Sequence, residues 1–154
     1  MSLTYLSLGS NMGNRLQLLH KAVELLMNRA GKVLAQSSFH ETEPWGFAST
    51  NNFLNAAVLL ETPLSPMKLL EQTELIERDL GRNSKSNNGV YKDRPIDIDI
   101  LLYDDQVIST QRLVVPHPAM HLRSFVMCPL TEIAAEIIHP VLKKSIFEIT
   151  KELS

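Results

Sequence analysis

The spacing of hydrophobic positions changes from one segment of this chain to the next, and that spacing predicts the secondary structure. Four segments read as strands, because apolar residues alternate with polar ones or form short apolar runs bounded by turn residues. These are residues 4–8, 33–39, 53–62 and 96–103, with a further short strand expected near Val107. The chain is therefore expected to contain a sheet built from these strands.

Two segments between the strands carry apolar residues every three to four positions, as helices that bury one face do. The first helix is expected to begin after Asn14, which can cap it, and to end at Gly31. The second is expected to begin at Ser65, with Pro66 at its first position, and to end at Gly81. The two predicted apolar stripes are Leu16, Leu19, Val23, Leu26 and Ala30, and then Leu69, Thr73, Ile76 and Leu80.

The predicted elements follow the order strand, helix, strand, strand, helix, strand. This order matches a split βαβ arrangement, in which an antiparallel sheet carries helices on one face. Further along, Pro116, Pro118 and Pro129 interrupt the pattern, and a last helix is expected from about Ser145. No repeat or linker divides the sequence, so residues 1–154 are expected to form a single α+β domain with a C-terminal extension.

Composition narrows the range of functions. Fifteen Lys and Arg against seventeen Asp and Glu give a net charge of −2 with neutral histidines, which argues against a general nucleic-acid or anionic-membrane binder. The single cysteine, Cys128, excludes an intrachain disulfide and a cysteine-based zinc cluster. No leader-like segment opens the sequence, and no apolar run reaches the ~20 residues of a membrane span. We therefore expect a cytoplasmic protein with small-molecule partners.

Two aspartates within one predicted strand are the strongest sign of chemistry. Side chains two apart in a strand share a face, so Asp97 and Asp99 should project together while Ile98 and Ile100 enter the core. Their spacing of ~6.6 Å along the strand suits a pair of magnesium ions bridging the oxygens of a polyphosphate. Carboxylates without cysteine partners favour magnesium over zinc. The simpler alternative is a strand with one solvated face.

A basic segment lies just before this strand. Residues 82–94 are polar and carry no apolar periodicity, so we expect a mobile loop there. Residues 78–94 hold five basic and two acidic side chains, a local charge of +3 that suits a polyphosphate. Arg82 and Arg94 bracket the loop, and its closure would bring them to the metal ions. For the remaining basic residues, a solvated loop is the simpler explanation.

Other candidate sites are weaker. The turn at residues 9–11 lacks the spacing of a nucleoside-triphosphate phosphate loop. His117 and His121 stand four apart, but the prolines on both sides of His117 argue against a helical zinc pair. His117 is the better candidate for a nucleotide contact, because Arg112 and Arg123 lie near it in the sequence. No nucleophile with a neighbouring base is evident, which disfavours covalent catalysis.

Several short motifs together resemble one enzyme family. They are Gly9-Ser10-Asn11, Asn55-Ala56-Ala57, Leu80-Gly81-Arg82, the stretch from Arg94-Pro95-Ile96-Asp97 to Ile98-Asp99-Ile100-Leu101, and Val115-Pro116-His117-Pro118. In combination they resemble the 6-hydroxymethyl-7,8-dihydropterin pyrophosphokinases of folate biosynthesis. The resemblance implies a ferredoxin-like βαββαβ core with helices packed on the antiparallel sheet. It also implies ATP and magnesium as requirements, and transfer of pyrophosphate from ATP to the hydroxymethyl group of the pterin, with release of AMP.

The resemblance also implies roles for individual residues. Asp97 and Asp99 would hold two magnesium ions and, with Arg82 and Arg94, would form the catalytic set. The residues implied on the ATP side are Glu74, Glu77, Arg82, Arg94, Ile100, Arg112, Leu113, His117 and Arg123. Those implied in the pterin pocket are Thr42, Pro44, Trp45, Phe53, Asn55, Tyr91 and Phe125. Aromatic faces and a polar amide suit a flat heteroaromatic ring, although without the resemblance core packing would be the preferred explanation of Phe53 and Phe125.

Two other functions remain open from the residues alone. A magnesium-dependent nucleotidyl transferase would also use an aspartate pair on a sheet, but it would release pyrophosphate in place of AMP. A ferredoxin-like RNA-binding module should present stacked aromatics and a basic face on its central strands, where residues 96–103 present two aspartates.

Overall fold

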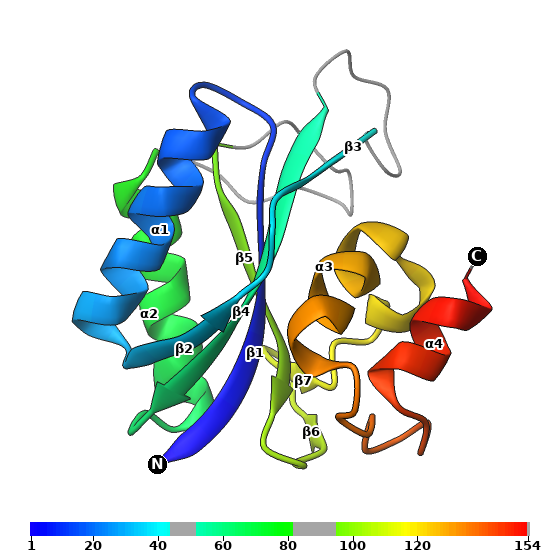
Figure 1. The fold of residues 1–154 in the computed structure, drawn as a ribbon. Helices are drawn as coiled ribbons and strands as arrows, with labels where there is room; N and C mark the ends of the chain where they lie inside the picture. Colours follow the sequence, from blue (N-terminus) through cyan, green and yellow to red (C-terminus); the bar gives the residue numbers. More distant parts are fainter. Residues whose placement is uncertain (44–51, 82–94, 154) are drawn as a thin grey trace.

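The computed structural model of the chain describes residues 1–43, 52–81 and 95–153. Their main feature is an antiparallel sheet in which β2, β4, β1 and β5 follow one another, with β3 also paired to β4 (Figure 1). The strands are β1 (Ser2–Ser10), β2 (Lys32–Gln36), β3 (His40–Thr42), β4 (Phe53–Thr62) and β5 (Asp97–Tyr103), and a separate hairpin consists of β6 (Ile108–Ser109) and β7 (Val114–Val115). The helices are α1 (Arg15–Arg29), α2 (Pro66–Asp79), α3 (Ser124–Ala134) and α4 (Ile146–Glu152), with a short 3₁₀ turn at Met120–Leu122. The predicted α+β class with an antiparallel sheet is confirmed.

Local sequence signals place the helix starts. The side chain of Asn14 accepts a hydrogen bond from the backbone N–H of Gln17, and Ser65 and Ser145 cap α2 and α4 in the same way. Pro66 takes the first position of α2, where its missing N–H costs nothing. Gly81 follows α2 with a φ of 106°, a left-handed conformation that favours glycine. These predicted helix boundaries are confirmed.

Helices cover both faces of the sheet, whereas the sequence predicted helices on one face only. In Figure 1, α1 and α2 pack on one side of the strands, and α3 and α4 on the other. Each side has its own core cluster: Leu6, Leu26 and Ile98 belong to the first, and Leu101 and Met127 to the second. The second layer was missed because Pro129, expected to interrupt the chain, lies within α3. The first half of this helix, residues 125–130, is apolar throughout, so its helical period does not stand out in the sequence as that of α1 does.

Two further expectations were wrong in detail. The strand predicted over residues 33–39 is shorter, because β2 ends at Gln36, and the separate strand β3, which was not predicted, begins at His40. Between them the buried Ser37 donates its backbone N–H to the Ala57 carbonyl and accepts from the Ala57 N–H through Oγ. Leu16, assigned to the buried stripe of the first helix, is 47% exposed, since it lies in the first turn beyond the edge of the core.

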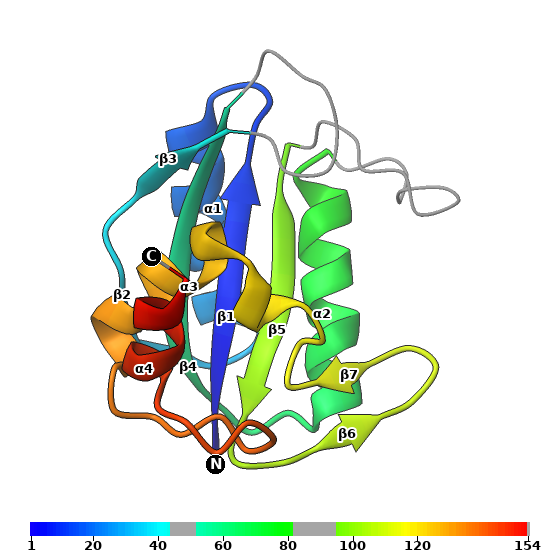
Figure 2. The ribbon, with the colours of Figure 1, turned by 90° about the vertical axis from the view of Figure 1, so that its right-hand side faces the viewer.

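The polar face of β5 is positioned by this layered arrangement. Ile98 and Ile100 are buried in the cluster beneath α1 and α2, so Asp97 and Asp99 point to the face that α3 covers. Viewed from the side in Figure 2, α3 lies in front of β4 and the adjoining part of β1. Within the described ranges, no helix is long and apolar enough to cross a membrane.

Candidate functional site

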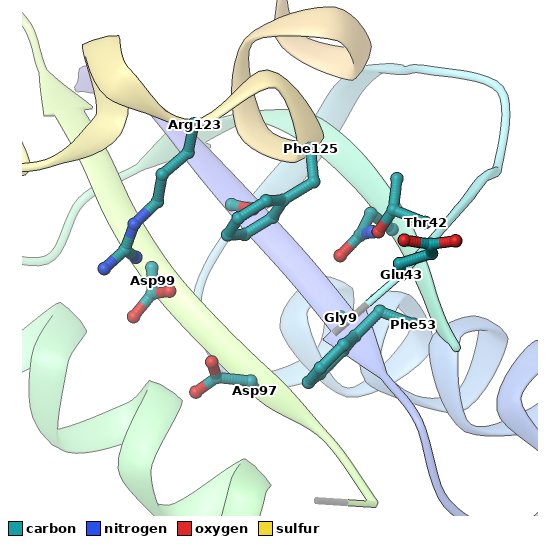
Figure 3. Close-up of a pocket in the computed structure, with 10 residues that line it drawn as sticks. Gly9, Thr42, Glu43, Phe53, Asp97, Asp99, Arg123 and Phe125 are labelled. Atoms are coloured by element: carbon teal, nitrogen blue, oxygen red, sulfur yellow. The ribbon is translucent and has the colours of Figure 1, made fainter. Parts of the chain in front are cut away.

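A pocket lies on the α3 face of the sheet, near the end of β1. The pocket is open to solvent, and the space between its walls, mouth included, is about 510 Å³. Four strands and one helix supply its walls (Figure 3). The lining residues are Ser7, Gly9, Thr42, Glu43, Phe53, Asn55, Asp97, Asp99, Arg123 and Phe125.

The pairing of the strands explains why distant parts of the sequence meet here. Gly9 of β1 lies opposite Asp97 of β5 on one side and opposite Asn55 of β4 on the other. Residues directly opposite in antiparallel strands point to the same face, so these three form one row across the sheet. Adjacent strands are ~4.8 Å apart, which places Asp97 and Asn55 ~10 Å apart with glycine between them. The row therefore has a carboxylate at one end, an amide at the other and a hollow in the middle.

The hollow depends on the absence of a side chain at Gly9. A Cβ added there would lie 3.0 Å from Asn55 Oδ1 and 3.6 Å from the ring of Phe53. The first distance is tighter than ordinary van der Waals contact, so any larger residue would have to displace the amide. The glycine thus forms the floor of the pocket.

Asp97 and Asp99 occupy the pocket side of β5, as their spacing predicted. Both are partly exposed, whereas Ile98 between them is buried. The side chain of Glu77, from α2, is itself 6% exposed and accepts a hydrogen bond of 2.8 Å from the backbone N–H of Ile98. Because β5 is at the edge of the sheet, this bond supplies a partner that a further strand would otherwise provide. The aspartate pair therefore stands on a strand fixed from both sides.

Aromatic rings border the middle of the pocket. Figure 3 shows Phe53 and Phe125 projecting into it, with Asp97 and Asp99 toward one end and Thr42 and Glu43 toward the other. The Arg123 guanidinium carbon lies 5.7 Å from the centre of the Phe125 ring, within the range of a cation–π contact. This contact holds a positive charge near the aspartates and keeps an aromatic face beside the hollow.

Asn55 is held in a defined orientation. Its Nδ2 donates a hydrogen bond of 2.7 Å to Oγ1 of Thr42, and the residue is 3% exposed. A donor and acceptor pair at the closed end of an aromatic pocket suits the edge of a nitrogen heterocycle.

His117 lies near the carboxylate end. Burial, together with the charge of Arg123, lowers the pKa of His117 to about 4, and the negative charge of Asp97 only partly opposes this shift. Its Nδ1 accepts the backbone N–H of Ala119 at 3.3 Å, which assigns the proton of the neutral ring to Nε2. At neutral pH this imidazole is therefore uncharged and offers an N–H donor.

The structure gathers part of the predicted site. It brings Thr42, Phe53, Asn55, Asp97, Asp99, Arg123 and Phe125 together around one pocket. Arg112 forms a 2.7 Å ion pair with Glu74, while Ile100 and Leu113 are buried in the core beneath α1 and α2. Pro44, Trp45, Arg82, Tyr91 and Arg94 lie outside the described residues. The functional role of each of these residues stays a prediction.

Three lining residues were not predicted. Ser7 and Gly9 lie on one face of β1. Their spacing of two was a usable signal, but residues 9–11 were given little weight because they lack the spacing of a phosphate loop. Glu43 follows β3 directly and carries no sequence signal of its own.

The donor set suits a hard divalent cation held jointly with a ligand. No group of three or more His, Cys, Asp or Glu side chains that could hold a metal occurs in residues 1–43, 52–81 and 95–153. Two carboxylates at a pocket wall match magnesium, which commonly takes one or two protein carboxylates and completes its shell with phosphate oxygens and water.

Comparisons with known proteins identify the family of the chain. The sequence profile of 7,8-dihydro-6-hydroxymethylpterin-pyrophosphokinase (HPPK) matches residues 5–135. A Porphyromonas gingivalis protein named 2-amino-4-hydroxy-6-hydroxymethyldihydropteridine pyrophosphokinase is 52% identical over 141 residues, which cover 91% of this chain and 95% of that one. An Aquifex aeolicus protein of the same name is 40% identical over 152 residues, covering 99% and 92% of the two chains.

The fold also has solved counterparts. Wild-type Plasmodium falciparum HPPK-DHPS with pteroate superimposes with a TM-score of 0.82 at 16% identity, covering 98% of this chain. This chain spans 44% of the length of that longer protein, so the likeness concerns the fold of one part of it. From the profile and the relatives, the chain belongs to the 7,8-dihydro-6-hydroxymethylpterin-pyrophosphokinase family.

Proposed function

We propose that this protein transfers the pyrophosphoryl group of ATP to the hydroxymethyl oxygen of 6-hydroxymethyl-7,8-dihydropterin and releases AMP, as a step of folate biosynthesis. Membership of the family and the names of the relatives support this reaction. It makes the protein an ATP-dependent diphosphotransferase.

The structural observation that best supports the proposal is the row formed by Asp97, Gly9 and Asn55 across the sheet. It joins a carboxylate end suited to metal-bound phosphates and an amide end suited to a heterocycle, ~10 Å apart on one rigid sheet. A pterin bound beside Phe53 and Phe125 with its edge at Asn55 would direct its hydroxymethyl group toward Asp97. The site therefore orients two substrates toward each other, which is most of what a phosphoryl-transfer enzyme must do.

Asp97 and Asp99 would hold magnesium, and we propose two ions. Bound magnesium would neutralise charge on the ATP phosphates and polarise the phosphoryl group under attack. The hydroxymethyl oxygen forms a bond to the β-phosphorus and loses its proton, while the bond from that phosphorus to the α,β-bridging oxygen breaks and AMP leaves. Arg123 supplies a fixed positive charge beside the aspartates. The neutral His117 donates its Nε2 proton in a hydrogen bond to ATP.

The remaining ATP contacts are proposed from the family resemblance. Arg82 and Arg94 would offset charge that develops on the transferred and bridging groups. Glu74, Glu77, Ile100, Arg112 and Leu113 complete the proposed ATP side. Arg112 is exposed and forms an ion pair with Glu74 of α2. Pro44, Trp45 and Tyr91 complete the proposed pterin pocket.

We also assign the core to the ferredoxin-like βαββαβ type, with residues 1–154 as one domain in the cytoplasm. The strand order β2, β4, β1, β5, with α1 and α2 on one face, supports the assignment. The segment after β5, including α3 and α4, would then be a C-terminal extension that covers the second face.

The experiment that tests the function is a product analysis by phosphorus NMR. The protein is incubated with ATP, magnesium and 6-hydroxymethyl-7,8-dihydropterin, and separate controls omit each component. We expect AMP to accumulate only in the complete mixture, in equal amount to a pterin diphosphate. Formation of free pyrophosphate with a nucleotidylated product would identify a nucleotidyl transferase instead.

A further inference from the structure

Arg15, the first residue of α1, connects two chain segments at the edge of the pocket. Its Nη1 donates one hydrogen bond to Oε1 of Glu41 at 3.0 Å and another to the backbone carbonyl of Asn52 at 2.9 Å. Glu41 belongs to β3, and Asn52 directly precedes β4. One guanidinium nitrogen, which carries two hydrogens, therefore joins the end of one strand to the start of the next.

The strands that Arg15 joins carry pocket residues. Thr42 of β3 pairs with Phe53 of β4, and both line the pocket. Arg15 holds the residue immediately before each of them, Glu41 and Asn52. Because side chains alternate along a strand, Glu41 points away from the face that Thr42 occupies. Arg15 does not line the pocket and acts on it from the opposite side of the sheet.

β3 depends on such contacts because it is short. It comprises three residues, and among the described residues its one strand partner is β4. At its other end, Ser38 and His40 are hydrogen-bonded to Glu132 of α3. A short strand with few buried contacts frays readily, so side-chain bonds at its ends decide how well its last pair is held.

We infer that Arg15 is a positioning residue for the heterocycle end of the pocket: by joining Glu41 to the Asn52 carbonyl, it fixes Thr42 and Phe53, and through Thr42 the Asn55 amide. The inference rests on the proposed function, because it assigns this end of the pocket to the pterin. It predicts that loss of Arg15 weakens pterin binding and leaves ATP binding at the aspartate end unchanged.

The expected effect is moderate. The side chains of Arg15 and Glu41 are 31% and 55% exposed, and an exposed ion pair alone changes an equilibrium about fivefold at most. Arg15→Ala also removes the bond to the Asn52 carbonyl, so the expected change is larger than that of the ion pair alone. The pterin KM should increase by about threefold to tenfold. The ATP KM and kcat should stay within about twofold of the wild type.

The same helix offers a matched control. Arg29, at the other end of α1, forms an ion pair of 2.6 Å with Asp79, and these side chains are 34% and 49% exposed. Neither residue lines the pocket. Arg29→Ala therefore removes a similar ion pair from the same helix, and it should leave the pterin KM unchanged.

The test measures both kinetics and local order. Pterin KM, ATP KM and kcat are compared for wild type, Arg15→Ala, Glu41→Ala, Arg29→Ala and the double variant Arg15→Ala/Glu41→Ala. The double variant should match Arg15→Ala alone, since both substitutions remove one shared interaction. Amide hydrogen exchange over residues 40–42, measured without substrates, should become faster in Arg15→Ala and stay unchanged in Arg29→Ala.

Three results would overturn the inference. They are an unchanged pterin KM in a folded Arg15→Ala protein, an equal rise in the ATP KM, or exchange in β3 that does not respond to Arg15. If Arg15→Ala fails to fold, Glu41→Ala decides alone: it should raise the pterin KM by a smaller factor. Failure of the proposed function gives a different result: the wild-type protein would neither bind the pterin nor form AMP. That result would also rule out the role inferred for Arg15.

Discussion

The carboxylate of Glu77 accepts a hydrogen bond of 2.8 Å from the backbone N–H of Ile98, the residue that separates Asp97 from Asp99. The bond crosses from α2 to the open edge of β5 and lies on the opposite side of that strand from β1. The position of both aspartates in the pocket therefore depends on a side chain that lies outside it.

Replacing Glu77 should consequently affect both stability and metal binding. Glu77→Ala leaves a buried N–H without this acceptor, and we expect a loss of about 1–3 kcal/mol in the free energy of unfolding. Glu77→Gln keeps an oxygen acceptor of the same length and should lose less. Urea unfolding measures the first effect, and magnesium titration in the presence of a non-hydrolysable ATP analogue measures the second. Normal metal affinity in a folded Glu77→Ala protein would contradict the positioning role.

The aspartate pair itself gives a second prediction. Asp97→Asn and Asp99→Asn keep the size of each side chain and remove one charge, so the fold should be retained while AMP formation falls by at least about a hundredfold. Circular dichroism and thermal unfolding check the fold, and AMP release measures activity. Asp105→Asn is the matched control, because Asp105 is exposed in the turn just after β5. Wild-type activity in Asp97→Asn or Asp99→Asn would show that the substituted aspartate is not needed to bind magnesium.

Gly9 and Gly31 provide a contrast between binding and stability. A Cβ at Gly9 would press on Asn55 Oδ1 from 3.0 Å, so Gly9→Ala should weaken pterin binding, by about tenfold if the displacement costs ~1.4 kcal/mol. A Cβ at Gly31 would lie 2.1 Å from the Glu61 carbonyl oxygen, far from the pocket. Gly31→Ala should therefore lower the free energy of unfolding by about 1–3 kcal/mol or prevent folding. Equal pterin affinity in wild type and Gly9→Ala would show that the hollow does not receive the pterin.

The lowered pKa of His117 predicts a pH dependence of stability. Its pKa is about 4 in the folded protein and about 6.5 when unfolded, so between these values the unfolded state binds more protons. Stability is unaffected by His117 above pH 6.5 and decreases as the pH falls toward 4. At pH 5 the loss should be about 2 kcal/mol relative to pH 7.

Two measurements check this behaviour of His117. The ring resonances in NMR, recorded without magnesium, should titrate near pH 4, and urea unfolding of His117→Asn should show a smaller loss of stability between pH 7 and pH 5. The negative charge of Asp97 raises the pKa of His117. Bound magnesium would offset that charge, so adding magnesium should not shift the His117 titration to higher pH. A titration near pH 6.5 would contradict a half-buried imidazole that is neutral down to about pH 4.

Sequence patterns correctly predicted several local features. The period of two placed Asp97 and Asp99 on the face opposite Ile98 and Ile100, because a strand with one buried face tolerates no other register. The predicted strand over residues 53–62 matches β4. Capping side chains likewise marked the starts of α1 and α2, since those bonds are made within one turn.

Long-range packing is what the sequence could not provide. Nothing local shows that α3 packs on the second face of the sheet, because the apolar run over residues 125–130 hides its helical period and Pro129 lies within it. The joining of Glu77 to Ile98 and of Arg15 to Glu41 depends on strand order and on the angle of each helix. Gly9 was similarly overlooked, because its significance lies in the two strands that flank it.

The most direct test of the proposed reaction follows the β-phosphorus of ATP. The protein is incubated with magnesium, 6-hydroxymethyl-7,8-dihydropterin and ATP labelled at that phosphorus, and the products are separated by chromatography. Attack on the β-phosphorus predicts that all transferred label is found in the pterin diphosphate and that the AMP is unlabelled. Label in ADP would indicate transfer of the γ-phosphoryl group alone, and label in free pyrophosphate would indicate attack at the α-phosphorus; either result would contradict pyrophosphoryl transfer.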